Sequence, residues 1–306
     1  MYGLFAVIGF GSAERYRFRA SGVASLWRYG VLDDPRHQRV SLIGWSDKGG
    51  LSYRSDADNR GSRALGTGVE RFSVGRFECM GQSVFPEERE PGNKCARLEV
   101  RKETCKVLGM VNITVVATGS VFLGSVREPV KNAKNPQGKL DQGIPFTKRP
   151  KALQLDYKLE LADQLVKATG MRSSEIEGKD NAEICLYLIQ RWEDEDGNVY
   201  ARRIGTGYCK FSESVSEWQN GFRIPIYYGD ISEEPFFRPE MMLELPDGPR
   251  YTTNSKGKNV PIQVVGWGDA DAEPTHLMLR ISSGDRGAFI GAVGTCFWID
   301  NVSLVY

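Results

Sequence analysis

Apolar and polar residues alternate in KALQLDYKLEL, residues 151–161. The apolar positions are Leu153, Leu155, Tyr157, Leu159 and Leu161, and the polar positions between them are Gln154, Asp156, Lys158 and Glu160. Because successive side chains of a strand point to opposite faces, this pattern predicts a β-strand with one face in a core and the other in water. Similar runs begin at Lys94, Val111, Phe222 and His276.

A second pattern predicts a hairpin. The run ICLYLIQRW, from Ile184 to Trp192, is apolar on both faces, which indicates a central strand covered on both sides. It ends in EDEDGN, residues 193–198, whose last three residues favour turns, and a further strand returns from Val199. With roughly eight to ten such strands separated by glycine, proline, asparagine and aspartate, we expect an all-β antiparallel sandwich and no α/β fold.

The N-terminal part differs in composition. Residues 1–90 hold twelve arginines and one lysine, whereas residues 91–306 hold thirteen and fourteen, and stretches such as RGSRALGTGVERFSVGRF lack sustained alternation. We therefore divide the chain into an atypical Arg/Gly/Ser-rich segment, residues 1–83, and a sandwich, residues 84–306. Three interpretations of the first segment stay open: an irregular cap, a disordered basic arm, or a mistaken start or frame.

Composition narrows the class of protein. The formal net charge is +1, which argues against a nucleic-acid-binding protein, and no apolar run approaches the roughly 18 residues of a membrane span. The apolar stretch Met1–Gly11 lacks the basic residues of an export signal, so no convincing signal peptide is expected. The six cysteines have no C-x-x-C pair and only two histidines accompany them, which is poor material for a zinc site. We expect the cysteines to be buried and reduced.

Several blocks resemble a known family. GSVFLG at residues 119–124 looks like the Gly-x-(Ile/Leu/Val)-Phe-x-Gly element of the putative carbohydrate metabolism domain, and GIPFTKRPKALQLDYK at residues 143–158 looks like its most characteristic block. Blocks beginning at Asn181, Ile224, Asn254 and Phe297 continue the resemblance in order. It covers about residue 84 to the end, and departs from the family before Val84.

The resemblance implies a jelly-roll β-sandwich similar to carbohydrate-binding modules, in envelope or secreted proteins of gut bacteria that degrade polysaccharides. Location at the cell envelope or outside the cell, and a role in polysaccharide utilisation, are therefore expectations that rest on the family. The ligand would be an oligosaccharide or polysaccharide.

Sugar binding needs flat aromatic faces and a few polar groups that fix hydroxyls. Trp192, at a strand end, and Trp218 and Trp267, among polar and glycine residues, are candidate platforms, whereas Trp298 lies in an apolar strand and is expected in the core. Further candidate ligand-binding residues lie on or before the polar face of residues 151–161. These are Arg149, Lys151, Asp156, Lys158 and Glu160; an ordinary solvated face is the alternative interpretation.

The sequence contains no evident catalytic constellation. A glycoside hydrolase needs two carboxyl groups roughly 5–9.5 Å apart, one with a raised pKa, and Asp156, Glu160, Glu183 and Asp300 lie on strand-like segments that offer candidates. Asp300 is also a candidate ligand for a structural calcium, or else a carboxylate that ties down a loop; no cofactor is required. We expect non-catalytic glycan binding, with two alternatives: a glycoside hydrolase with its carboxylate pair on the concave sheet face, or a structural or adhesive cell-surface module.

Overall fold

The computed structural model places short strands within residues 5–82, at 5–8, 39–41, 44–45, 51–53, 63–64, 69–74 and 77–82, and describes the chain at 83–91, 93–107, 111–126, 137–170, 172–286 and 289–306. Side chains are described at 83–91, 93–104, 114–125, 137–168, 172–286 and 289–306. The rest of residues 1–82, on which the three interpretations of the N-terminal segment depend, lies outside the described residues.

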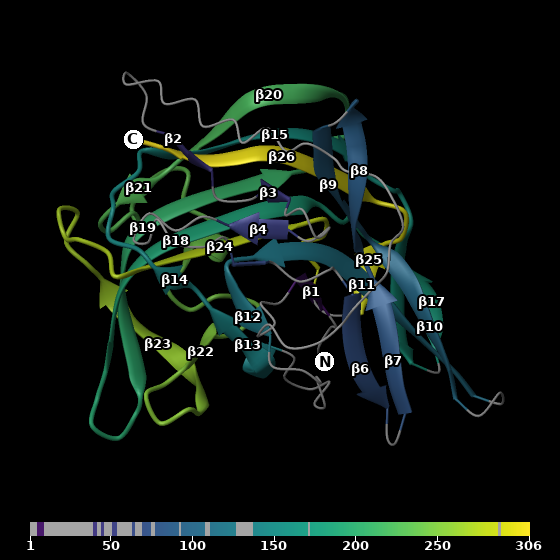
Figure 1. Ribbon diagram of the computed structural model, residues 1–306, viewed down its shortest axis with the longest axis horizontal. Coiled ribbons are helices and arrows are strands. Elements are labelled where there is room, and N and C mark those ends of the chain that lie inside the picture. Colours follow the sequence, from purple (N-terminus) through teal and green to yellow (C-terminus); the bar gives the residue numbers. More distant parts are fainter. Residues whose placement is uncertain are drawn as a thin grey trace.

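Two curled sheets form the sandwich, one above the other in Figure 1, and three minor sheets accompany them. Across the large sheet the strands lie in the order β17 (Ser173–Ile176), β16 (Leu165–Gly170), β11 (Val111–Phe122), β24 (His276–Ser282), β18 (Ala182–Glu193), β19 (Val199–Phe211), β23 (Asn259–Trp267) and β22 (Tyr251–Thr253). Strands that pair along it are β1 (Phe5–Ile8), β10 (Arg101–Val107), β14 (Ile144–Pro145), β21 (Tyr227–Tyr228) and β25 (Ile290–Ala292).

The small sheet lies above the large one in Figure 1. Its order is β20 (Val215–Pro225), β15 (Ala152–Glu160), β26 (Cys296–Val305), β9 (Asn93–Glu99) and β8 (Val84–Glu90), and β2 (Arg39–Ser41) also pairs with β26. The three minor sheets consist of β3 (Gly44–Trp45), β4 (Leu51–Tyr53) and β5 (Arg63–Ala64), of β6 (Val69–Val74) and β7 (Phe77–Gln82), and of β12 (Gly124–Val126) and β13 (Leu140–Gln142). The remaining elements are the 3-10 helices η1 (Gln137–Lys139) and η2 (Pro239–Met241).

The expected all-β antiparallel jelly-roll sandwich is confirmed, with two parallel pairings, β1 with β11 and β19 with β23. The core lies between the sheets, and Leu153, Leu155 and Leu159 of β15 are fully buried in it, as their alternation predicts. Truncation of such a leucine typically destabilises a protein by about 2–5 kcal/mol. No helix in the described part of the chain is long and apolar enough to cross a membrane.

The predicted hairpin is β18 and β19, which pair from Glu193 and Val199 at the turn to Ala182 and Phe211. β18 lies between β24 and β19, and both its faces are buried, as its two-sided apolar pattern predicts. Residues on one face join the core between the sheets. The other face, called here the outer face of the large sheet, carries a second apolar cluster that includes Cys185, Tyr187, Ile189, Tyr208 and Met278.

The two glycines of the GSVFLG block explain its spacing. A Cβ at Gly119 would lie 2.5 Å from both the Ser83 carbonyl oxygen and the Glu99 amide nitrogen, so only glycine lets β11 approach that backbone. Gly124 has φ +154°, and a Cβ there would lie 2.1 Å from the Asp141 carbonyl oxygen. The block therefore fixes backbone approaches inside the sandwich.

The described cysteines are free thiols, and Cys95 and Cys185 are buried, as expected, while Cys209 and Cys296 are half-buried. The side chains of Cys79 and Cys105 lie outside the described residues.

Candidate functional site

Two carboxylates meet on the outer face of the small sheet. Asp156 of β15 and Asp300 of β26 are direct partners across the strand pair, next to a register shift between Gln154 and Asp156. Asn301 has a positive φ of 51° at this irregularity. Like charges directly opposite one another on a sheet repel, so this arrangement requires a cation.

Arg89 of β8 supplies that cation. Its Nη1 donates to Asp156 Oδ2 at 2.8 Å and to Asp300 Oδ2 at 2.9 Å, and its Nη2 donates to Asn220 Oδ1 at 2.5 Å. The same guanidinium lies 4.1 Å from the ring centroid of Trp218. We call this group the Arg89 cluster: Arg89, Asp156, Trp218, Asn220, Asp300 and Asn301. It unites three residues singled out from the sequence, Asp156, Trp218 and Asp300, around an arginine that was not.

Hydrogen bonds decide the charge of Asp156. Burial alone would raise its pKa, but the bonds that it accepts from Arg89, from the side chain of Asn301 and from the amide of Gly221 lower the pKa below its ordinary value. Asp156 is therefore ionised at neutral pH. Its oxygens are already bound by donors within the protein.

Asp300 has the role of loop tie that was one of its two expected roles. Its oxygens accept from Arg89, from Asn93 Nδ2 at 3.2 Å and from the amide of Asn301 at 2.8 Å. Both oxygens of this carboxylate are therefore bound by donors of the protein. Among the described residues, no group of three or more His, Cys, Asp and Glu side chains converges as metal ligands. Calcium at Asp300 stays a prediction without a supporting contact.

The other candidates on β15 contact their own neighbours. Lys158 Nζ lies 4.1 Å from the ring centroid of Trp298 and 3.5 Å from Glu160 Oε1. Trp298 is buried, as expected, but it lies on the outer side of β26, where its Nε1 donates to Glu87 at 2.9 Å. Phe297 and Ile299, its neighbours in the chain, are the residues that face the core.

The remaining candidates lie apart from the Arg89 cluster. Arg149 stacks on Tyr228 at 4.2 Å and donates to the carbonyls of Ala270 and Ala272, so it fixes a loop. Lys151 is exposed at the start of β15. Trp267 is half-buried against the outer apolar cluster of the large sheet, with its ring edge-on to Phe237 at 6.3 Å.

Trp192 lies in a different environment. Among the tryptophans whose side chains the structure describes, it is the most exposed, at 43%. Its cross-strand partner on β19 is Tyr200, and the two rings stack with centroids 5.9 Å apart and planes 23° apart. The β18–β19 hairpin extends beyond the small sheet at the lower left of Figure 1, so this aromatic pair is not covered by the upper layer.

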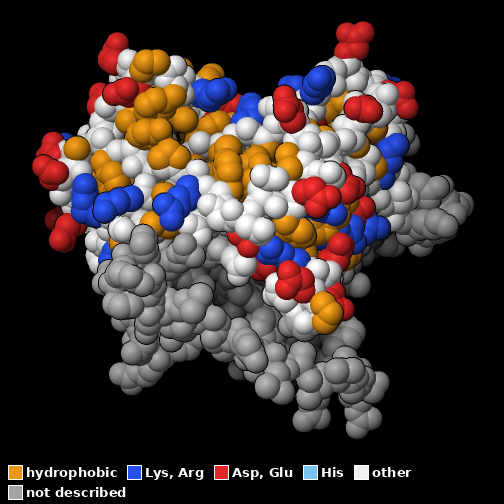
Figure 2. Space-filling view, turned by 90° about the horizontal axis from the view of Figure 1, so that it is seen from above, with side chains coloured by type: hydrophobic (Ala, Val, Ile, Leu, Met, Phe, Trp, Pro, Cys, Tyr) orange, Lys and Arg blue, Asp and Glu red, His pale blue; other side chains and the backbone are white. Residues whose placement is uncertain are grey.

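Polar side chains surround this pair. By strand alternation and register, Gln190, Arg202 and Gln263 share its face, and all three are exposed. Val265, whose side chain is 55% exposed, adds apolar surface beside them. We call this set the hairpin surface: Gln190, Trp192, Tyr200, Arg202, Gln263 and Val265. Seen from above the small sheet, hydrophobic side chains gather at the upper left and in the centre of the molecule, and acidic and basic side chains lie along the left edge and on the right (Figure 2).

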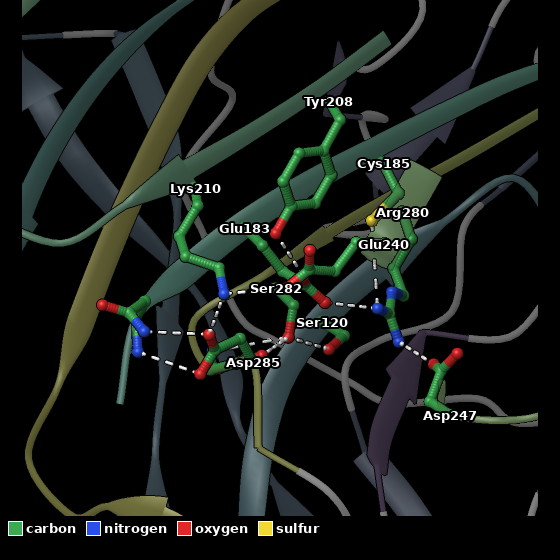
Figure 3. A network of polar contacts seen from close by, with 12 residues as sticks. Ser120, Glu183, Cys185, Tyr208, Lys210, Glu240, Asp247, Arg280, Ser282 and Asp285 are labelled. Atoms are coloured by element: carbon green, nitrogen blue, oxygen red, sulfur yellow. Dashed lines mark hydrogen bonds and ion pairs between the residues drawn. The ribbon is translucent and has the colours of Figure 1, made fainter. Parts of the chain in front are cut away.

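A third polar group lies on the outer face of the large sheet (Figure 3). Arg280 of β24 forms ion pairs with Glu183 of β18 and, at 3.1 Å, with Asp247, which also binds Arg250 at 2.9 Å. Burial raises the pKa of Glu183, and its ion pair with Arg280 offsets this only in part. The pKa of Asp247 falls to about 2 because the charges of Arg250 and Arg280 outweigh its burial.

Residues 231–248, which we call the strap, cover this outer face. Ile231 and Met241 are buried in its apolar cluster, and Glu240 of the strap binds Lys210 of β19 at 2.8 Å. Lys210 also binds Asp285 at 3.0 Å. Sequence reasoning singled out only Glu183 in this network, because the other members lie in loops or single polar positions that carry no periodic signal.

The amino-acid sequence matches the model of one protein family. The family model described as "Putative carbohydrate metabolism domain" matches residues 40–234, more than half of the chain, and begins upstream of Val84. A search of curated proteins found no match.

One of two similar solved structures shows the same fold. A "putative glycoside hydrolase" from Bacteroides thetaiotaomicron VPI-5482 aligns with TM-score 0.51 and 15% identity, covering 88% of this chain and 70% of that chain. A "putative glycoside hydrolase" from Bacteroides vulgatus ATCC 8482 aligns with TM-score 0.42 and 15% identity, covering 72% of this chain and 76% of that chain. At this identity, the first similarity concerns the fold alone.

Proposed function

We propose that this chain, which belongs to the putative carbohydrate metabolism domain family, binds a glycan at the hairpin surface without cleaving it. The family supports a carbohydrate-related role. The observation that carries the proposal is the exposed Trp192, stacked on the half-buried Tyr200, on a part of the large sheet that the small sheet leaves uncovered.

The chemistry of this surface suits a sugar. An exposed indole face packs against the apolar face of a pyranose ring, and amide and guanidinium groups beside it bind hydroxyl groups. Gln190, Arg202 and Gln263 provide such groups on the same face.

The Arg89 cluster suits catalysis poorly. A glycoside hydrolase needs one carboxyl group that is protonated and can donate to the leaving oxygen. Asp156 has a lowered pKa, and both it and Asp300 accept hydrogen bonds from Arg89 Nη1. A ligand there would have to displace Arg89 from two carboxylates and from the face of Trp218.

Glycoside hydrolysis on the outer face of the large sheet is the second candidate function. Glu183 has a raised pKa and Asp247 a lowered one, which is the division of roles between acid and base that such enzymes use. The solved structure of similar fold, from Bacteroides thetaiotaomicron VPI-5482, is named as a putative glycoside hydrolase. Arg280 binds both carboxylates, and Asp247 belongs to the strap that covers Glu183. Substrate entry would therefore require Arg280 and the strap to move.

One experiment separates the two functions. The full chain is incubated with a panel of insoluble plant and host polysaccharides; retention is measured by pull-down and cleavage by released reducing ends. We expect retention on at least one polysaccharide with no release. Release that disappears in Glu183→Gln would favour the hydrolase, and absence of both retention and release would point to a structural or adhesive module.

The family resemblance also supports a location at the cell envelope or outside the cell. Cell fractionation with an antibody against the chain tests this part of the proposal, and recovery in the cytoplasmic fraction alone would contradict it.

A further inference from the structure

Arg203 is a fully buried cation in the interior of β19. It is 1% exposed and faces the outer side of the large sheet, where its guanidinium carbon lies 3.8 Å from the ring centroid of Tyr187. The strap covers this place: Tyr187 donates to the carbonyl of Glu240 at 2.7 Å, and Trp267, the cross-strand neighbour of Arg203, packs against Phe237.

The Arg203 side chain lacks an acceptor. Its Nε and Nη1 are buried without a hydrogen-bond partner among the described residues. The carboxylates of the polar network on this face serve other cations, since Asp247 binds Arg250 and Arg280 while Glu183 binds Arg280. An unpartnered buried charge is costly, and the ion pairs around it show that this region otherwise satisfies its charges.

Arg203 does not lose its unpartnered charge by deprotonation at neutral pH. Burial lowers the pKa of Arg203 to about 10, so the guanidinium remains charged at neutral pH. Its planar fork of N–H groups matches the two oxygens of a carboxylate, and the Tyr187 ring shields one of its faces from water.

A small space lies beside Tyr187. Its walls include Tyr187, Arg250 and Arg280 but not Arg203, so the Tyr187 ring lies between the guanidinium and this space, which leaves about 10 Å³ of free volume, about enough for one water molecule. Two of its walls are cations, and Arg250 and Arg280 are both held by Asp247 of the strap. Movement of the strap away from the sheet would therefore break both of these ion pairs.

We infer that Arg203 is the anchor of a binding site for a carboxylate group, which the strap closes in this structure. The ligand is either a uronic acid, which is a sugar that carries a carboxylate, or a simple organic carboxylate. These two ligands present the same carboxylate group to the guanidinium. The assignment of a uronic acid as the ligand rests on the proposed function, whereas the presence of a carboxylate-binding site does not.

Thermal unfolding of the full chain tests the site at constant ionic strength with sodium glucuronate, sodium acetate or glucose. We expect a saturable rise in Tm of roughly 2–4 °C with glucuronate and none with glucose, because a ligand that binds only the folded state stabilises it. An equal half-saturation with acetate assigns a simple carboxylate as ligand, and a response to glucuronate alone assigns the uronic acid.

Variants locate the effect. Arg203→Met should abolish the rise, and Arg172→Met, an exposed arginine between β16 and β17 and outside both proposed sites, should keep it. If Arg203→Met does not fold, Arg203→Lys provides the test. Lysine keeps the positive charge but lacks the paired N–H donors of the guanidinium, so the glucuronate concentration at half-saturation should rise about tenfold. An unchanged response in either Arg203 variant, or no response in the unmodified chain, would overturn the site. Retention on neutral polysaccharides does not depend on Arg203, so the two proposals fail separately.

Discussion

The Arg89 cluster and the hairpin surface each contain a tryptophan among polar side chains, but they differ in what those groups do. In the Arg89 cluster, a guanidinium covers Trp218 and binds two carboxylates, whose side chains are only 11% and 12% exposed. At the hairpin surface, Trp192 stacks on Tyr200 and is exposed beside polar groups that face solvent.

This difference separates stability from binding. Side chains that satisfy one another within the protein lower the free energy of the fold, and a ligand must break those contacts before it can form its own. Exposed rings and exposed amides lose only water when a sugar arrives. The same residue types therefore predict different roles in the two regions.

The largest expected effect is on stability, at the Arg89 cluster. Arg89→Met leaves Asp156 and Asp300 facing each other without a cation, and should lower the free energy of unfolding by about 3 kcal/mol. Urea unfolding measures it. Arg101→Met is the matched control on β10, because its side chain is 40% exposed and its ion pairs are long, at 3.8 and 3.9 Å; it should change stability by about 0–1 kcal/mol. Equal effects of the two variants would mean that the cluster is not structural.

A smaller effect is expected from pH. The pKa of Asp156 is lower in the folded protein than its ordinary value of 3.8, so its stabilising contribution is complete above that value and is lost as pH falls through the folded pKa. Asp156→Asn should therefore be less stable than the unmodified chain at pH 7, and the gap should narrow below about pH 4. Urea unfolding from pH 7 to 2.5 measures the gap, and a gap that stays constant would contradict the assignment.

The smallest effect is expected at Lys158. Lys158→Met removes the cation that stacks on Trp298, and should lower the free energy of unfolding by about 0.5–1 kcal/mol. Lys151→Met, exposed at the start of the same strand, is the control. If Lys158→Met instead weakens glycan retention and leaves stability unchanged, the polar face of β15 belongs to the binding surface.

Alternation predicted the long strands and missed the short ones. β15 and β18 carry enough residues to show their core-facing positions, which were predicted correctly. The expectation that the polar face of β15 lies in water was wrong for Gln154 and Asp156, which are buried by their contacts with neighbouring side chains. Roughly eight to ten strands were expected after residue 84, whereas β8 to β26 number nineteen. Strands of two or three residues, such as β14, β21 and β25, show no period because pairing with longer neighbours defines them. The domain boundary at Val84 stays a prediction.

The sites were less predictable because their members are distant in the chain. Arg89 lies 67 residues from Asp156 and 211 from Asp300, and Arg280 lies 97 residues from Glu183. No spacing in the sequence links such partners. Trp192 was a candidate at a strand end, but only the pairing of β18 with β19 shows that Tyr200 stacks on it, and only the layer arrangement shows that the pair is uncovered.

The central claim is that glycan binds at the hairpin surface and not at the Arg89 cluster. The most direct measurement is retention on the polysaccharide that the unmodified chain binds best, compared for Trp192→Ala, Trp218→Ala and Trp267→Ala, with thermal unfolding to show that each variant is folded. The account predicts a loss of about tenfold or more in affinity for Trp192→Ala, since loss of one aromatic platform removes roughly 1–3 kcal/mol, and near-normal retention for the other two. Normal retention by Trp192→Ala, with loss in folded Trp218→Ala or Trp267→Ala, would contradict it.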